Sequence, residues 1–349
     1  MEIAILYDYI VVGAGFSGSI FARYIAEELD KKVLLLEKRN HIAGNAYDYK
    51  DEHGILVHKY GPHIFHTNFE KVYSYLIKYS KWEKFFLKCN VYMLNKFTPS
   101  PFNFATIDEY FTTEKAQNIK DHIRLVYGDK DKATIVEMLE CNDPIVREYA
   151  DFLFKYDYSL YTAKQWGISP AEIDISVLKR VPVLFSYKTG YFDDLYQMMP
   201  KEGYTKVFED ILNHENITIK LNTDAKNIIS ITENNEIQFE GKVTSVPVIY
   251  TGAIDELFEN RFGKLPYRSL KFDWITYKQE SYQDAPVVAY PEAKDYTRIT
   301  EYKKLPVQNI KDITTIAIEY PLQYENNINL EPYYPIPTIN NQNIYESCR

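Results

Sequence analysis

Cysteine is scarce in this chain of 349 residues, and its three copies stand far apart. Cys89, Cys141 and Cys348 form no CxxC pair and no cluster with histidine, which argues against a disulfide framework and against a metal site. Because unpaired thiols persist in reducing compartments, we expect a cytoplasmic protein.

Basic charge is also in deficit, since 40 Lys and Arg residues face 49 Asp and Glu residues, a formal net charge of −9. The broad basic face of a nucleic-acid binder is therefore not expected. No apolar run reaches the roughly 20 residues of a transmembrane helix. The apolar start at residues 3–12 is interrupted by Asp8 and lacks the basic region of a signal peptide. We expect no integral membrane segment, and an anionic ligand would need a local basic pocket.

What the chain does have is a hydrophobic fraction of 46%, enough for a substantial core. A β-branched run at residues 9–12, a helical pattern at 17–29 and an apolar run at 33–36 predict a βαβ unit. Residues 69–153 show little strand character, which indicates a helical insertion. Short strands then return at 217–219, 237–239 and 248–250, and we interpret them as a returning sheet.

A glycine motif lies where the first predicted strand meets the helix. Gly13, Gly15 and Gly18 form a GxGxxG pattern that also contains Ser17, and Glu37 follows at the end of the next strand. In dinucleotide-binding folds such glycines allow a tight turn and close approach of a pyrophosphate, and the distal carboxylate binds a ribose. The alternative is a turn that packs this way for structural reasons alone. The motif does not separate FAD from NAD.

Polar residues follow Glu37 directly, namely Lys38, Arg39, His41, Gly44 and Asn45. Cations and amide donors at this position suit a phosphate group, although an exposed basic loop would look the same. Tyrosine is frequent, at 32 residues, and forms a cluster between Tyr267 and Tyr334. Aromatic faces of this kind suit uracil, flavin and sugar rings, and they also serve ordinary packing.

From this point the sequence resembles the bacterial UDP-galactopyranose mutase family. The matching blocks lie at residues 37–45, 60–67, 161–167, 179–183, 190–192, 204–205, 267–270, 296–299 and 332–335. Their order and spacing extend over almost the whole chain. The resemblance implies interconversion of UDP-galactopyranose and UDP-galactofuranose, through an adduct of the sugar C1 with N5 of reduced FAD. It also implies an unidentified external reductant, a homodimer and a role in cell-surface polysaccharide synthesis.

The resemblance assigns roles to individual residues. It implies that Arg180 and Arg298 hold the diphosphate. It also implies that the substrate pocket is lined by Tyr158, Tyr161, Trp166, Tyr191 and either Tyr333 or Tyr334. It implies that a second block faces the flavin, namely His63, Ile64 and His66. Judged by pattern alone, each arginine could form a surface salt bridge, each aromatic residue could be core, and each histidine could be structural.

Three departures from the family pattern stand out. Ala43 replaces the first glycine of a Gly-Gly pair, which would alter a close approach to the cofactor if positive φ is needed there. Ala289 stands where the family tends to carry asparagine, so one polar contact is expected to be absent. The family also continues past Tyr-Tyr-Pro to a segment that closes the flavin pocket. We therefore expect a C-terminally truncated mutase with weakened FAD binding and activity.

We predict an α/β fold with a Rossmann-like FAD-binding domain, a helical insertion and an antiparallel sheet substrate domain. The predicted parts are residues 1–75 with parts of 200–265 for FAD, 76–160 for the insertion, 161–200 with 266–335 for the sheet and substrate cleft, and 336–349 for a short tail. Two other functions stay open, a flavin amine oxidase-type oxidoreductase and a non-catalytic UDP-binding remnant.

Overall fold

The structure, a computed structural model, describes residues 6–167, 178, 181–232, 234, 236–324, 330–336 and 338–348. Within these residues a parallel sheet has the strand order β12-β2-β1-β16. Its strands are β1 (Tyr9–Val12), β2 (Val33–Leu36), β12 (Ile217–Lys220) and β16 (Val248–Tyr250), and helix α1 (Phe16–Glu28) joins β1 to β2. All four residues of β2 are buried, as expected of a strand inside a parallel sheet. The predicted βαβ unit is confirmed.

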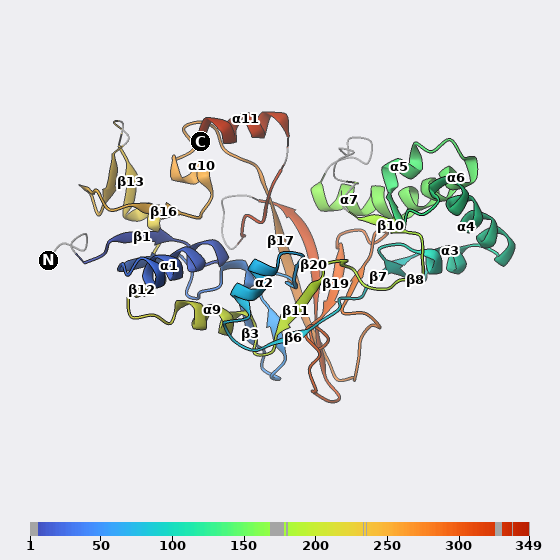
Figure 1. Cartoon of the computed structure of the whole chain (residues 1–349), viewed down its shortest axis with the longest axis horizontal. Coiled ribbons are helices and arrows are strands. Elements are labelled where there is room, and N and C mark those ends of the chain that lie inside the picture. Colours follow the sequence, from blue (N-terminus) through green and yellow to red (C-terminus); the bar gives the residue numbers. More distant parts are fainter. Residues whose placement is uncertain are drawn as a thin grey trace.

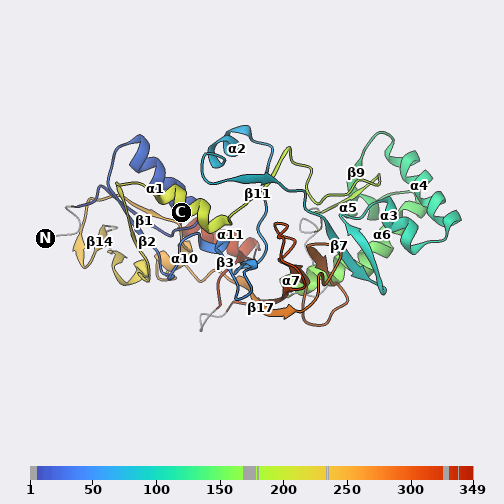
Figure 2. The same ribbon diagram turned by 90° about the horizontal axis from the view of Figure 1, so that it is seen from below.

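A second, mostly antiparallel sheet occupies the middle of the molecule, with the order β21-β17-β20-β19-β18-β7-β8 (Figures 1 and 2). Its strands are β7 (Cys89–Met93), β8 (Lys96–Ser100), β17 (Tyr267–Tyr277), β18 (Val287–Ala289), β19 (Arg298–Glu301), β20 (Thr314–Gln323) and β21 (Tyr334–Pro335). The long pair β17 and β20 runs in antiparallel register from Arg268 opposite Gln323 to Tyr277 opposite Thr314. This sheet therefore connects the parallel sheet to the helices at the opposite end.

The helices at that far end enclose their own hydrophobic core (Figure 1). They are α3 (Phe104–Tyr110), α4 (Thr113–Tyr127), α5 (Ile135–Leu139), α6 (Pro144–Leu153), the π-helical turn η3 (Phe154–Tyr158) and α7 (Ser159–Trp166). Side chains of Asn103, Thr112, Thr134 and Asp143 accept hydrogen bonds from backbone N–H groups at the N-termini of α3 to α6. These caps satisfy donors that the helices leave free.

The remaining elements lie between these parts or around the parallel sheet. They are η2 (Gly44–Ala46), β3 (Asp48–Lys50), β4 (Leu56–His58), β5 (Phe65–Thr67), α2 (Glu70–Leu76), β6 (Trp82–Lys84), β9 (Lys132–Thr134), β10 (Pro182–Leu184), β11 (Tyr196–Pro200), α9 (Tyr204–Leu212), η5 (Ala225–Asn227), β13 (Ile229–Ile231), β14 (Ile237–Phe239), β15 (Lys242–Val243), α10 (Ile254–Leu257) and α11 (Ile339–Cys348). No helix among the described residues is long and apolar enough to cross a membrane.

The expectation of little strand character at residues 69–153 was wrong, because β6, β7 and β8 precede α3, and β7 and β8 belong to the central sheet. Strand β7 pairs with β8 and also with β18, which lies about 200 residues further along the chain, so local sequence gives little sign of this second pairing. Strand β14 occupies the predicted residues 237–239, but it pairs antiparallel with β13 and β15 rather than joining β12 and β16 in the parallel sheet. Gly241, with φ +77°, forms the turn that folds this strand back on β15.

Candidate active site

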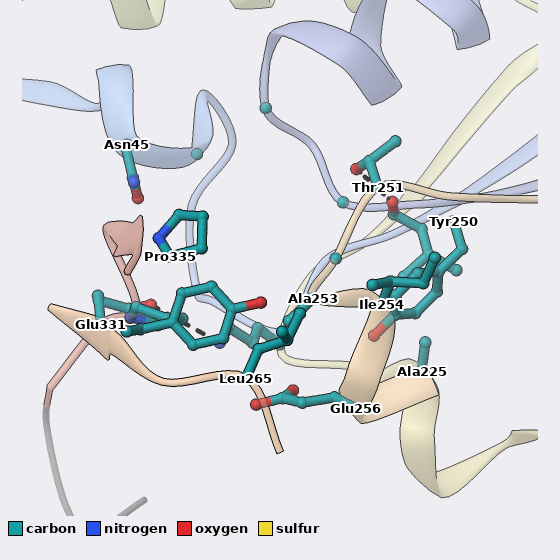
Figure 3. A pocket seen from close by; sticks show the side chains of 18 of the residues that line it. Asn45, Ala225, Tyr250, Thr251, Ala253, Ile254, Glu256, Leu265, Glu331 and Pro335 are labelled. Atoms are coloured by element: carbon teal, nitrogen blue, oxygen red, sulfur yellow. Dashed lines mark hydrogen bonds and ion pairs between the residues drawn. The ribbon is translucent and has the colours of Figure 1, made fainter. Parts of the chain in front are cut away.

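A cavity of about 800 Å³ opens at the carboxyl ends of β1, β2 and β16. Residues from 331–345 cover it, and Figure 3 shows Glu331 and Pro335 with Asn45 on one side, facing Tyr250, Thr251 and Ile254. Ligands of doubly wound α/β folds bind at this edge of the sheet. The cavity is therefore the candidate cofactor site.

The GxGxxG turn forms one wall of the cavity through close backbone packing. A Cβ atom at Gly18 would lie 1.9 Å from the carbonyl oxygen of Gly13, and one at Gly44 would lie 2.8 Å from the Cα of Gly15. Among the described residues, no side chain caps α1, whose N-cap is Gly15. The first N–H groups of this helix are thus open to an anion, which suits a pyrophosphate. Ser17 and Gly18 lie inside the first turn of α1 and do not line the cavity.

Glu37 ties this turn to the end of β2. Its side chain is only 5% exposed, and its carboxylate accepts hydrogen bonds from the backbone N–H groups of Ala14, at 2.8 Å, and Arg39, at 2.9 Å. The residue also lines the cavity, as a ribose-binding carboxylate would. A dinucleotide therefore fits this site, with an uncapped helix terminus for the phosphates and a carboxylate for a ribose.

The loop after Glu37 is held by an ion pair that the sequence did not predict. Arg39 donates from Nη2 to Oε2 of Glu331, at 2.7 Å, and to Oδ1 of Asn45, at 2.9 Å, and its guanidinium lies 4.3 Å from the ring centroid of Tyr60. Burial acts to raise the pKa of Glu331, but Arg39 and Lys38 outweigh it and hold the pKa below its usual range. Lys38 Nζ lies 3.6 Å from Glu331. This loop is therefore docked against residues 330–336 and is not a free basic loop.

Ala43 adopts the left-handed backbone conformation, with φ +74°, and is buried at the wall of the cavity. Its N–H donates to the carbonyl oxygen of Ala14 at 2.9 Å. The positive φ considered from sequence is thus present, with a strain of about 1 kcal/mol for a residue that carries a Cβ atom. Ala289 lies on β18 directly opposite Arg298.

Arg298 begins β19 and faces Glu319, its cross-strand partner on β20. Its Nε and Nη2 atoms both donate to Oε2 of Glu319, at 2.7 Å, and the Glu319 side chain is 2% exposed. Burial alone would lower the pKa of Arg298, but Glu319 holds it above its ordinary value. The buried carboxylate thus stabilises the charged guanidinium and fixes one of its edges.

His63 connects this arginine to the cavity. It lines the cavity, and both burial and the charge of Arg298 lower its pKa, so the ring is neutral at pH 7. The backbone N–H of His63 donates to Nδ1 of His58 at 3.0 Å, and the ring Nδ1 of His63 lies 2.8 Å from the carbonyl oxygen of Gly61. The backbone from Gly61 to His63 is therefore held in place at the end of the cavity nearest Arg298.

The other two residues of the predicted flavin-facing block are placed differently. Ile64 is half-buried and packs against a core cluster. His66 pairs with Asp194 at 2.8 Å, stacks on Phe192 with ring centroids 3.6 Å apart, and does not line this cavity. Of the three, the structure therefore brings His63 alone to the cavity wall.

Tyr161 and Tyr334 both interact electrostatically with Arg298, as does the buried Tyr302. Tyr334 is 40% exposed, whereas Tyr333 interacts with Arg39, Tyr60 and Glu319, the ion-pair partner of Arg298. Both members of the tyrosine pair left open by the sequence therefore lie near the ion pair of Arg298 and Glu319.

The other predicted substrate residues have different surroundings, although Tyr191 interacts electrostatically with Tyr161. Tyr158 is buried and donates to the carbonyl oxygen of Val181 at 3.0 Å, a core arrangement. Trp166 ends α7, and Tyr191 stacks edge-on with Phe192. Arg180 lies outside the described residues.

Comparisons with known proteins agree with this arrangement. A family model described as UDP-galactopyranose mutase matches residues 157–349, and one for a NAD(P)-binding Rossmann-like domain matches residues 11–79. UDP-galactopyranose mutase of Mycoplasma pneumoniae is 35% identical, over 97% of this chain and 86% of that protein. dTDP-fucopyranose mutase of Escherichia coli is 34% identical, over 96% and 86%.

Solved structures share the fold. A reduced UDP-galactopyranose mutase has a TM-score of 0.69 at 17% identity and covers 97% of this chain and 86% of that one. A putrescine oxidase has a TM-score of 0.51 at 11% identity, with 90% and 75% covered. On its sequence identity to the curated mutases and its match to the family model, the chain belongs to the UDP-galactopyranose mutase family.

Proposed function

We propose that this protein interconverts UDP-galactopyranose and UDP-galactofuranose and binds FAD, in its reduced form for activity. The observation that carries the proposal is the position of Arg298, which is half-buried, paired with the buried carboxylate of Glu319 and in electrostatic interaction with the cavity residue His63. An arginine held there can bind the diphosphate that leaves the sugar, because guanidinium N–H groups form strong hydrogen bonds with phosphate oxygens.

Each group of residues contributes a separate part of the binding site. The N-terminus of α1 and Gly15 would hold the cofactor pyrophosphate, and Glu37 would bind its ribose. Reduced FAD, when bound, supplies the nucleophilic flavin nitrogen that the reaction requires.

On the substrate side, Tyr161 presents an aromatic face to the nucleotide and Tyr334 a hydroxyl to the diphosphate. His63, being neutral, adds no positive charge and acts through position. The protein thus provides orientation and electrostatic stabilisation.

The wider assignments rest on family membership. They are a discontinuous cofactor domain with the predicted boundaries, Arg180 as second diphosphate ligand, a cytoplasmic homodimer, an external reductant, and supply of galactofuranose for cell-surface polysaccharide. We take these as parts of the same proposal.

Two alternatives have distinct chemistry. A flavin amine oxidase would share the fold, as the putrescine oxidase does, but its cationic substrate gives no reason for an arginine near the cavity residue His63. A non-catalytic remnant would bind UDP without FAD. The relative from Escherichia coli acts on a dTDP-sugar, which makes the nucleotide a variable to test.

The deciding experiment starts with the visible spectrum of the purified protein and the stoichiometry of FAD released on denaturation. The same sample is then reduced with dithionite and given UDP-galactofuranose, dTDP-fucofuranose or an amine. Formation of UDP-galactopyranose only after reduction supports the proposal. Oxygen consumption with the amine, or UDP binding by a colourless protein that gives no product, refutes it. Faster turnover of the dTDP-sugar would correct the substrate.

A further inference from the structure

Lys164, on helix α7, makes an unusual set of contacts with one loop. Its ammonium group donates to the carbonyl oxygens of Tyr290, at 2.8 Å, Tyr296, at 2.7 Å, and Ala293. A lysine ammonium has three donors, so all three are used on backbone atoms of this one loop.

The loop that Lys164 holds leads directly into Arg298. It joins β18 to β19, and it is closed by the hydrogen bond from Tyr290 N to the carbonyl oxygen of Thr297, at 2.8 Å. Thr297 N in turn donates to the carbonyl oxygen of Glu319 at 2.9 Å. The position of the loop therefore sets where the Arg298 backbone enters the site.

Helix α7 also carries Tyr161, three residues before Lys164. Residues three apart on a helix lie on the same face, so the lysine and the tyrosine move together with α7. The electrostatic interaction between Tyr161 and Arg298 shows that the two elements meet at the site. Lys164 thus links the element that bears Tyr161 to the loop that bears Arg298.

We propose that Lys164 is a positioning residue for the mutase reaction, which keeps Arg298 at a fixed place relative to Tyr161. This inference rests on the proposed function, because it concerns the same diphosphate site. A displacement of about 1 Å at such a site can reduce the rate by about 100-fold. Methionine at this position would remove three hydrogen bonds from one loop without removing any group assigned to substrate.

The charge on Lys164 gives the proposal a pH signature. Burial lowers the pKa of Lys164 to about 8, although Asp295 in the loop and Asp157 on η3 act to raise it. Once the ammonium loses its proton, one carbonyl oxygen faces a lone pair instead of a donor. We therefore expect the activity that depends on this contact to fall as the pH rises above about 8.

The test compares Lys164→Met and Lys164→Arg with the control Lys303→Met in the FAD-loaded protein. Lys303 is buried, and its ammonium group donates to two atoms of Glu280, the backbone carbonyl oxygen at 2.8 Å and a carboxylate oxygen at 2.7 Å. Each variant is measured for thermal unfolding, FAD content, UDP affinity, kcat and KM. The rate of hydrogen–deuterium exchange of the backbone amides is also measured at residues 290–298.

We expect Lys164→Met to lower kcat/KM by roughly tenfold or more, to weaken UDP binding and to speed exchange at residues 290–298. Lys303→Met should keep wild-type kinetics at a similar loss of thermal stability. Lys164→Arg, which stays charged, should recover part of the activity and lose the decline above pH 8.

The inference would be overturned if Lys164→Met had the same kcat/KM and the same exchange rate at residues 290–298 as the wild-type protein. An equal loss of kcat/KM in Lys303→Met would also overturn it. If the wild-type protein has no mutase activity, the proposed function fails. UDP affinity and exchange at residues 290–298 then still decide whether Lys164 positions this loop.

Discussion

Replacement of Glu319 by glutamine tests the electrostatic arrangement around Arg298 most directly. The carboxylate is 2% exposed and accepts both Nε and Nη2 of Arg298 at one oxygen, each at 2.7 Å. Glutamine keeps the size of the side chain and one acceptor but removes its negative charge. The half-buried guanidinium then loses its counter-charge.

The expected loss of stability follows from this burial. Removing one partner of a fully buried ion pair costs about 3 to 5 kcal/mol, and the retained amide oxygen and the partial exposure of Arg298 place Glu319→Gln at or below the lower value. Because Arg298 would also lose its fixed orientation, we expect kcat/KM to fall by roughly tenfold. Urea unfolding measures the first quantity, and steady-state kinetics after dithionite reduction measures the second.

Glu301→Gln is the matched control. Glu301, on β19, is a buried glutamate like Glu319. It accepts hydrogen bonds from Tyr282 N, Gln283 N and Thr314 Oγ1 rather than from an arginine. It should lose stability while keeping its kinetics. The reasoning is refuted if Glu319→Gln has wild-type kcat/KM, or if Glu301→Gln loses as much kcat/KM.

Three further predictions concern other parts of the molecule. Gly44→Ala should weaken FAD binding by at least about tenfold by fluorescence titration, because its Cβ would lie 2.8 Å from the Cα of Gly15; unchanged affinity would contradict the close approach. Burial lowers the pKa of His58 from 6.5 to about 3, so the unfolded chain takes up the proton first as the pH falls. The unfolding free energy should therefore decline by up to about 1.4 kcal/mol per pH unit between pH 6.5 and 3, and His58→Asn, which can still accept from His63 N, should lack this part of the slope. Burial raises the pKa of Cys89 to about 12, so iodoacetamide at pH 8 should leave it unmodified in mass spectra of the native protein, and rapid labelling would show that this thiol is accessible.

Features built from neighbouring residues were predictable from the sequence. The GxGxxG turn, the strand before it and the helix after it follow from glycine positions and apolar runs, and the helix occupies Phe16–Glu28 against an expected 17–29. The location of Glu37 at the end of β2 followed in the same way. Short-range patterns suffice here because the turn and its two flanking elements are one continuous stretch of chain.

Contacts across the central sheet were not predictable. Strand β7 was missed because its partner β18 is distant in sequence and its alternating burial is only five residues long, and β8, which pairs with β7, was missed with it. The ion pair between Arg39 and Glu331 joins residues almost 300 positions apart. No local pattern distinguishes Glu331 from an ordinary surface glutamate.

The sequence by itself determined the dinucleotide-binding turn, the family and the identity of the arginine expected at the diphosphate. Tertiary structure alone decided that Glu319 orients Arg298, that Tyr161 and Tyr334 interact with it, and that Lys164 contacts the loop before it. The physical reason is that these partners are chosen by strand register and by the packing of α7 on the sheet. Both are set by the whole fold rather than by any one segment.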